Sequence, residues 1–312
     1  MLISVIVPTF NEEKVIKESY RRLANVFINN NLPDYELIFI NDGSRDKTMF
    51  FMREIALKDE HVKLLNFSRN FGHQAAVTAG LKECKGDVAV IIDADLQDPP
   101  EVILDMLKVF EKEECNVVYG VRNKRKGESF FKLLTAKMFY RLLNSLSDIS
   151  FPVDTGDFRL IDRKVIDAFN NLHEKNKYIR GLISWLGFKQ CPVYYNREAR
   201  FAGETKYPFS KMLKFASIGL FYFSKKPLKL ATSVGFTSIF AGLLIALWLL
   251  ISQIFGLGHT VSGWTSTIII IIFFGGVQLL TIGVLGQYIG SLFDEVKNRP
   301  EYIIAEKVNF NE

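Results

Sequence analysis

The stretch VAVIIDADLQDPPE, residues 88–101, joins an apolar run to a pair of acids and then to two prolines. Residues 88–92 are all apolar, a length typical of a buried strand. The run ends at Asp93 and Asp95. Alternate side chains of an extended segment point the same way, so both carboxylates are predicted to face one ligand.

Two adjacent carboxylates repel each other, and a bound divalent cation removes that repulsion. Oxygen ligands favour Mg²⁺ or Mn²⁺, held by one or two carboxylates together with substrate phosphates. Asp93 and Asp95 are therefore predicted to bind such a metal. The alternative is a turn in which the two acids only cap backbone N–H groups.

Apolar runs alternate with helical periodicity over the first 121 residues. Strands are predicted at 2–7, 35–40, 62–67, 88–92 and 117–121, and helices at 12–29, 44–58, 74–83 and 100–112. This order indicates an α/β fold with a mostly parallel sheet and helices on both faces. Ligands of such sheets bind beyond the carboxyl ends of the strands, where this sequence places PTFNE, NDGS, DAD and RNKR.

The part of the chain at residues 230–293 has the composition of a membrane protein. Residues 230–293 contain no Asp, Glu, Lys or Arg. Helices at 228–251 and 265–289 are each long enough to cross about 30 Å of hydrocarbon. Lysine and arginine flank the pair but are missing from the loop at 252–264, which predicts that both termini are cytoplasmic.

These features divide the chain. We expect a catalytic domain at 1–207, a juxtamembrane amphipathic helix at 208–227, the two spans, and a cytoplasmic tail at 290–312. Two Phe-rich basic segments, 130–146 and 208–224, fit either a helix in the membrane interface or a helix packed on the sheet.

Charge and cysteine content exclude other classes. A net charge of +5, without a basic repeat or zinc-finger spacing, does not indicate a nucleic-acid partner. Cys84, Cys115 and Cys191 are far apart and include no CxxC pair, so we expect three reduced thiols and no structural zinc. His73, near a predicted helix start, is expected to cap or pack rather than to act in catalysis.

The motifs VPTFNEE, NDGSRDKT, DADLQDPPE, RNKR and DTGDFRLIDR together resemble family 2 glycosyltransferases. Within that family the chain is similar to the polyprenyl-phosphate glycosyltransferases, over essentially its whole length. The resemblance implies a GT-A-like, Rossmann-like domain followed by two transmembrane helices. The QxxRW signature of processive synthases is absent, which implies transfer of a single sugar.

The resemblance also assigns site residues. It implies that the nucleotide sugar contacts the residues Pro8, Glu12, Asp42, Asp93, Gln97, Arg200 and Lys206. Arg122 and Arg125 match residues that meet the acceptor phosphate, and Asp157 matches the acid beside the reacting sugar. Asp95 is assigned to catalysis through the metal. For Asp42 the residues alone leave two roles open: a cap of the next helix, or an acceptor for a base or ribose.

The function implied is an inverting transfer of one sugar from a nucleotide-diphosphate sugar to polyprenyl phosphate at the membrane. A UDP-linked glucose or N-acetylglucosamine is the expected donor, and a homo-oligomer is left open. Two alternatives remain: a sugar nucleotidyltransferase, and a membrane scaffold without catalysis. The nucleotidyltransferase leaves the two spans unexplained, and the scaffold predicts loss of the charged strand-end residues, which all stand.

Overall fold

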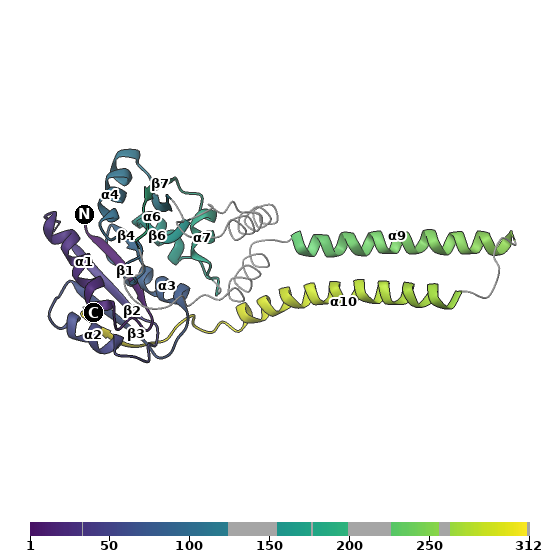
Figure 1. Ribbon diagram of the computed structural model, residues 1–312, viewed down its shortest axis with the longest axis horizontal. Helices are drawn as coiled ribbons and strands as arrows, with labels where there is room; N and C mark the ends of the chain where they lie inside the picture. The colour runs from purple at the N-terminus through teal and green to yellow at the C-terminus, as the bar shows by residue number, and fades with distance from the viewer. Residues whose placement is uncertain (33, 124–154, 176, 199–225, 256–262, 311–312) are drawn as a thin grey trace. The chain divides into compact units, whose positions relative to one another are not determined.

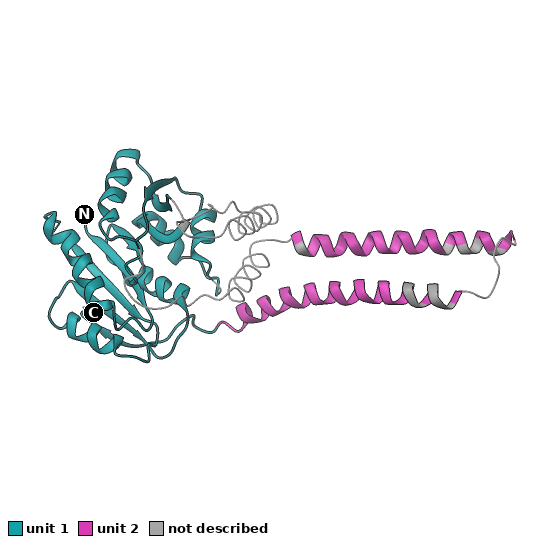
Figure 2. Ribbon diagram, viewed as in Figure 1, with its two compact units in different colours: residues 1–140, 149–208, 299–312 teal, residues 141–148, 209–298 magenta. Residues whose placement is uncertain are grey.

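A computed structural model describes residues 1–32, 34–123, 155–175, 177–198, 226–255 and 263–310. These residues fall into two compact units (Figure 2). One unit holds the described residues up to 198 together with 299–310, and the other holds those from 226 to 298. The predicted amphipathic segments at 130–146 and 208–224 lie outside the described residues.

The first unit is built on one sheet, which has eight strands among the described residues. Its order is β7-β5-β6-β4-β1-β2-β3-β8. All strands run in one direction except β6 and β8, which are antiparallel to their neighbours. The strands are β1 (Ile3–Thr9), β2 (Tyr35–Asn41), β3 (Val62–Phe67), β4 (Val88–Ile91), β5 (Val117–Arg122), β6 (Thr155–Asp162), β7 (Gln190–Tyr195) and β8 (Ile304–Val308). The mostly parallel sheet is confirmed.

Helices cover both faces of the sheet, as predicted (Figure 1). They are α1 (Ile16–Asn29), α2 (Thr48–Ala56), α3 (His73–Glu83), α4 (Val102–Glu113), α6 (Arg163–Asn170) and α7 (Ile179–Trp185). Strands β1 and β2 are buried along their full length, which is why most of their residues are apolar. Val5 and Val7 join the core with Phe27 of α1, while Ile6 lies under α3.

Strand β6 was not predicted, and it determines where the chemistry lies. It inserts antiparallel between β4 and β5, with Ile91 paired to Arg159. The same register, continued by two residues, aligns Asp93 with Asp157. Two acids that are 64 residues apart in sequence therefore meet at one edge of the sheet.

The predicted C-terminal tail contributes a strand. β8 pairs antiparallel with β3, with Leu64 opposite Val308, and closes that edge of the sheet. The Asn309 amide donates to the carbonyl oxygens of Ala56 at 2.6 Å and Val62 at 2.8 Å. The chain thus returns to the catalytic sheet after its last apolar helix.

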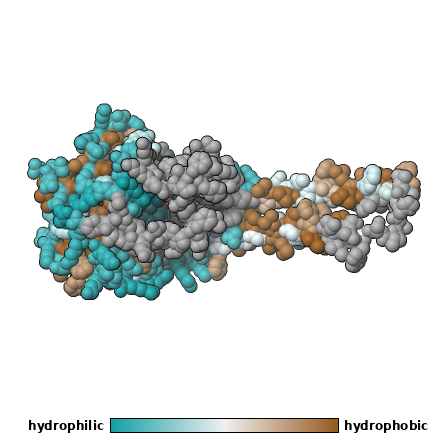
Figure 3. All heavy atoms as spheres, in the orientation of Figure 1, coloured by the Kyte–Doolittle hydropathy of each residue, from teal (hydrophilic) through white to brown (hydrophobic). Residues whose placement is uncertain are grey.

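The second unit contains α9 (Lys226–Ile254) and α10 (Gly263–Val296). Each is long and apolar enough to cross a membrane, over Leu228–Ile245 and Ile270–Val296. Figure 3 shows the contrast between the largely hydrophobic surface of these helices and the hydrophilic surface of the first unit. Both helices begin or end a few residues outside the predicted spans.

The prediction of three reduced thiols is wrong for two of them. Cys115 and Cys191 form a disulfide, and Cys84 is buried and free. Cys115 lies two residues before β5, and Cys191 lies in β7, the parallel neighbour of β5. Because β7 was not predicted, the sequence offered no reason to expect the two cysteines to meet.

Candidate active site

Four segments place ionisable side chains at the carboxyl edge of the sheet. Asp93 follows β4, and Asp157 lies in β6. His73 is the first residue of α3, and Arg180 lies in α7. The carboxyl edge is where ligands bind in open parallel sheets.

Asp157 is held by two cationic side chains. Arg180 donates from Nε to Oδ1 at 2.6 Å and from Nη2 to Oδ2 at 3.0 Å, a bidentate pair. Nε2 of His73 lies 3.2 Å from Oδ2 of Asp157. Burial raises the pKa of Asp157, but Arg180 and His73 outweigh it and hold that pKa well below its usual range. Asp157 is therefore ionised at neutral pH.

The His73 ring bridges two carboxylates. Its other nitrogen, Nδ1, lies 3.8 Å from Oδ1 of Asp93. Burial lowers the pKa of His73, but the ion pair with Asp157 and the charge of Asp93 raise it to about 9. The expectation that His73 only caps or packs is thus incomplete. His73 is the first residue of α3, one residue before the predicted start of that helix, and it also joins the acidic cluster. Neither His73 nor Arg180 was assigned by the motifs.

Asp93 lies in a crowded acidic environment. Partial burial raises its pKa, the carboxylates of Asp157, Asp95 and Asp98 raise it further, and the resulting value is about 6 even with His73 nearby. Its side chain keeps 37% of its surface exposed. A surplus of negative charge of this kind is what a bound cation or a charged substrate relieves.

Asp95 is nearly buried, and its Oδ1 accepts a hydrogen bond from the backbone N–H of Gln97 at 3.1 Å. The turn-capping alternative therefore holds for one of the two acids. Leu96 adopts a left-handed φ of 57° inside this turn. Among the described residues no three His, Cys, Asp or Glu side chains are arranged to hold a metal ion.

Asp42 binds a different loop from the one expected. Its carboxylate accepts hydrogen bonds from the Asn70 amide at 2.9 Å, from Phe71 N–H at 2.7 Å and from Gly72 N–H at 3.0 Å. The next helix, α2, has no side-chain cap, so that proposed role is wrong. Asp42 instead links β2 to the loop that leads into His73. Burial raises its pKa despite these donors.

A polar cavity of about 710 Å³ opens at the carboxyl ends of β1, β2 and β3. Its lining includes amide, hydroxyl and guanidinium groups, from Phe10, Asn11, Asn41, Gly43, Ser44, Arg45, Met49, Asn66, Phe67, Ser68, Arg69 and Asn70. The predicted nucleotide residues Pro8, Glu12 and Asp42 neighbour this lining in sequence but do not form it. The loop at 66–70 was not predicted to take part.

The remaining assignments divide between described and undescribed residues. Arg122 ends β5, and its Nη2 lies 3.4 Å from Oδ2 of the buried Asp98. Burial lowers the pKa of Arg122, but Asp98 outweighs it and the pKa is raised. The Gln97 carbonyl accepts from Glu198 N–H at 2.9 Å. Arg125, Arg200 and Lys206 lie outside the described residues.

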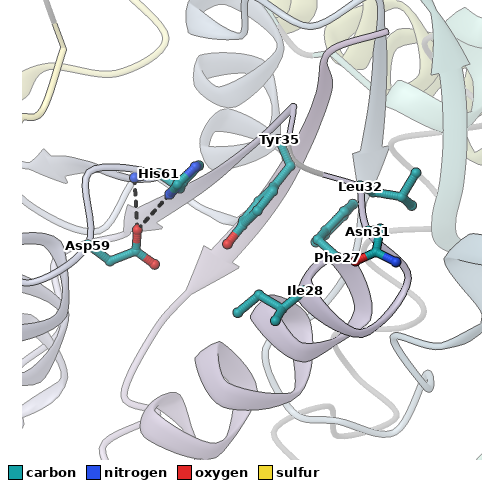
Figure 4. A pocket seen from close by; sticks show the side chains of 7 residues that line it. All are labelled: Phe27, Ile28, Asn31, Leu32, Tyr35, Asp59 and His61. Atoms are coloured by element: carbon teal, nitrogen blue, oxygen red, sulfur yellow. Dashed lines mark hydrogen bonds and ion pairs between the residues drawn. The ribbon is translucent and has the colours of Figure 1, made fainter.

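A second cavity, of about 560 Å³, lies at the opposite edge of the sheet (Figure 4). Its walls are mainly aromatic and aliphatic, from Phe27, Ile28, Asn31, Leu32, Tyr35, Asp59 and His61. Phe27, Tyr35 and His61 stack with ring centroids 4.5 and 4.6 Å apart. Asp59 Oδ1 accepts a hydrogen bond from the backbone N–H of His61 and contacts Nδ1 of the His61 ring. Among the described residues that line this cavity Asp59 is the one acid, so the cavity lacks a cluster of acids like that around Asp93.

Comparisons with known proteins identify relatives along nearly the whole chain. The family model described as glycosyl transferase family 2 matches residues 4–169, more than half of the 312 residues. The chain is 52% identical to the uncharacterized glycosyltransferase YkcC of Bacillus subtilis, over 97% of this chain and 93% of the relative. It is 39% identical to the bactoprenol glucosyl transferase of Shigella phage SfII, over 98% of each chain.

Solved structures are more distant. The mannosyltransferase PcManGT of Pyrobaculum calidifontis, solved with GDP-Man and Mn²⁺, shares 17% identity at a TM-score of 0.46, over 92% of this chain and 86% of that one. Glucosyl-3-phosphoglycerate synthase of Mycobacterium tuberculosis, solved with Mg²⁺ and UDP, shares 20% identity at a TM-score of 0.47, over 70% and 77%. At these values the likeness carries no information on the ligands of this chain.

Proposed function

Because this chain belongs to glycosyl transferase family 2, we propose that it moves one sugar from a nucleotide-diphosphate sugar to the phosphate of a polyprenyl lipid. It is a glycosyltransferase, with full-length relatives named bactoprenol glucosyl transferases. The observation that carries the proposal is the ionised Asp157, clamped by Arg180 and His73 beside Asp93. For the donor we propose a UDP-sugar of the glucose or N-acetylglucosamine type.

The reaction is a single displacement with inversion at the anomeric carbon. An oxygen of the acceptor phosphate forms the new bond to that carbon, and the bond from the carbon to the donor diphosphate breaks with its electron pair. A phosphate monoester has a second pKa of about 6, so the nucleophile is largely ionised and no strong base is needed. The lowered pKa of Asp157 suits it to stabilise positive character at the anomeric carbon rather than to accept a proton.

Arg180 and His73 orient Asp157 for this role. The bidentate Arg180 pair fixes the plane of the carboxylate, and His73 fixes its second oxygen. A charge that is already positioned needs no reorganisation when the transition state forms. Arg180 and His73 are thus positioning residues in the proposed mechanism.

Asp93 and Asp95 are the residues that would hold a Mg²⁺ or Mn²⁺ ion. Burial and the neighbouring carboxylates of Asp157, Asp95 and Asp98 raise the pKa of Asp93, and a bound cation would relieve the repulsion among these acids. When bound, such an ion neutralises charge developing on the leaving diphosphate. With only two carboxylates from the described chain, waters and substrate phosphates complete the ligand set in this proposal.

The nucleotide is proposed to occupy the cavity at the ends of β1, β2 and β3. Amide groups of Asn41 and Asn66 line it and suit the polar edges of a base and ribose. Asp42 acts one step away, because it holds the loop at 70–72 that borders the cavity. Pro8 and Glu12 remain proposed contacts at the neighbouring strand end.

Helices α9 and α10 are proposed to cross the cell membrane, with the catalytic domain and both termini in the cytoplasm. Their length and composition support this placement. It brings a lipid-linked phosphate within reach of a soluble domain. Arg122, Arg125, Arg200 and Lys206 are proposed to receive the acceptor and donor phosphates, as the family resemblance implies. No oligomeric state is proposed.

The two alternatives are less well supported. A nucleotidyltransferase acts on soluble substrates, so this function does not explain the presence of the two apolar helices α9 and α10. A non-catalytic scaffold does not explain why Asp157 is kept ionised by contacts with both Arg180 and His73. The family assignment and the full-length relatives favour transfer over both.

The test is transfer of labelled sugar from a panel of UDP- and GDP-sugars to undecaprenyl phosphate, with the full chain in membranes. We expect product from one donor, its loss in EDTA, and a fall of about 10²-fold or more in Asp95→Ala. Asp105→Ala is the matched control, because Asp105 is exposed on α4 and pairs only with Lys108 among the ion pairs described. It should keep full activity.

Two outcomes would overturn the proposal. One is product formation that is insensitive to both EDTA and Asp95→Ala. The other is sugar transfer to a soluble acceptor with none to the polyprenyl phosphate. Addition of excess Mg²⁺ or Mn²⁺ to the EDTA-treated sample should restore the product, and the more effective ion identifies the preferred metal.

A further inference from the structure

Asp98 is a buried acid to which the motifs assign no role. It lies three residues after Asp95 and directly before two prolines. Its side chain is only 2% exposed. A buried carboxylate without partners is strongly disfavoured, so its contacts indicate why it is tolerated there.

Three side chains from other segments converge on Asp98. The Tyr195 hydroxyl, at the end of β7, donates to Oδ1 at 2.5 Å. Arg122 Nη2, at the end of β5, lies 3.4 Å from Oδ2, and Arg197 Nε lies 3.6 Å from Oδ1. Arg122 Nε also lies 3.4 Å from the Tyr195 hydroxyl, so the cluster is cross-linked. We call these four residues the Asp98 cluster.

The Asp98 cluster is tightly packed against the strand that carries Asp157. A Cβ added at Gly156, the residue before Asp157, would lie 2.9 Å from Arg122 Nη2. A Cβ added at Gly120 would lie 2.7 Å from the Tyr195 ring. The Phe158 ring packs edge-on against Tyr195, with centroids 5.6 Å apart. Because these two positions are glycines, the Arg122 guanidinium can pack against the backbone of Gly156, next to Asp157. The Tyr195 ring can likewise pack against the backbone of Gly120.

The charges of the cluster do not cancel. One carboxylate faces two guanidinium groups, which leaves one positive charge in excess. Each guanidinium has five N–H donors in a planar fork that matches phosphate oxygens, and Asp98 and Tyr195 engage only part of them. Arg122 and Arg197 keep 21% and 34% of their side chains exposed. Two guanidinium groups held by one carboxylate, each with unused donors, suit the oxygens of a phosphate.

We propose that Asp98 is a positioning residue that, with Tyr195, holds Arg122 and Arg197 to receive the phosphate monoester of the acceptor. This inference rests on the proposed function, and it adds Asp98, Tyr195 and Arg197 to the acceptor site. Asp98 acts through the arginines and does not touch the acceptor. The phosphate recognised is that of the lipid, not the diphosphate of the donor.

Two variants test the role by separating acceptor from donor kinetics. Tyr195→Phe removes one hydroxyl and changes no charge, and Asp98→Asn removes the charge with little change in shape. For both, we expect the KM for undecaprenyl phosphate to rise roughly tenfold while the donor KM changes less than twofold. Tyr194→Phe, at an exposed neighbouring position of β7, is the matched control and should change neither constant.

The remaining outcomes overturn the inference. A rise in donor KM instead assigns the arginines to the donor diphosphate. A lower KM for the acceptor in Asp98→Asn would mean that the negative charge of Asp98 opposes phosphate binding by Arg122 and Arg197, and that Asp98 does not position them. Unchanged constants in Tyr195→Phe exclude a positioning role even if Asp98→Asn fails to fold. If inorganic phosphate inhibits wild type and variants equally, the Asp98 cluster is not the place where phosphate binds. A wild-type protein with no transfer to the lipid refutes the proposed function itself.

Discussion

The carboxylates at the two edges of the sheet differ in their surroundings and in the direction of their pKa shifts. At the amino edge, Glu36 accepts hydrogen bonds from Ser4 Oγ at 2.5 Å and Lys85 N–H at 2.7 Å and pairs with Lys63. Burial raises the pKa of Glu36, but these partners outweigh it and the pKa is lowered. At the carboxyl edge, burial and the charges of neighbouring acids raise the pKa of Asp93 to about 6.

The difference separates residues that stabilise the fold from residues kept for chemistry. A charged side chain with hydrogen-bond and ion-pair partners stabilises the folded state. A charged side chain surrounded by charges of the same sign destabilises it, and such groups are found at functional sites, where a bound ligand relieves the repulsion. The aromatic cavity lined by Phe27, Tyr35 and His61 belongs with the amino edge, because its rings pack on one another. Substitutions at the amino edge should therefore alter stability, and those at the carboxyl edge should alter activity.

The largest effect is expected at the amino edge, from Phe27→Ala. Phe27 is fully buried and stacks on Tyr35, so its truncation should lower the free energy of unfolding by about 3–5 kcal/mol. Thermal unfolding of the full chain in detergent measures this. The kcat of the folded fraction, at a temperature below the transition, should stay within twofold of wild type.

Phe50→Ala provides the control for that substitution. Phe50 lies on α2 with 66% of its surface exposed, so the same change should shift stability by less than about 1 kcal/mol. A variant Phe27→Ala that is stable but inactive would contradict the separation of the two edges.

At the carboxyl edge, Arg180→Lys should act on the reaction instead. A lysine keeps the charge but cannot make the bidentate contact with Asp157, so kcat should fall roughly 10²-fold with little change in melting temperature. Arg53→Lys, at an exposed ion pair with Glu306, is the control and should leave kcat unchanged. A large loss of stability without loss of kcat would show that the Asp157–Arg180 pair is structural.

The smallest effect is a pH dependence at Glu36. Its folded pKa is lowered, so its contribution is fully present above the unfolded value of about 4.3 and is lost as pH falls through the folded pKa. Glu36→Gln should therefore be less stable than wild type by about 1–3 kcal/mol at pH 7, with the gap closing in acid. Melting temperatures between pH 7 and pH 3 measure it.

Glu111→Gln, at an exposed position of α4, should follow wild type at every pH. If Glu36→Gln keeps a constant deficit from pH 7 to pH 3, the carboxylate of Glu36 is not the titrating group. That result would remove the electrostatic basis for contrasting Glu36 with Asp93.

Part of the site could be read from local sequence alone. Val88–Ile91 forms a strand because it is apolar and short, and Asp93 and Asp95 follow it as predicted. Asp157 was found only through its family motif. His73 and Arg180 carry no local signal, because a lone histidine or arginine at a helix start has many ordinary roles. Their function depends on β6 and α7, which periodicity did not predict.

The sequence by itself determined where apolar strands end in charged residues, and that two long, mostly apolar helices follow the α/β domain. Those features depend on near neighbours, which hydrophobic periodicity reports. Only the tertiary structure decided that β6 would align Asp157 with Asp93, that Tyr195 and Arg122 would meet on Asp98, and that β8 would close the sheet. These pairings join residues tens to hundreds of positions apart, and the packing of the whole sheet selects them.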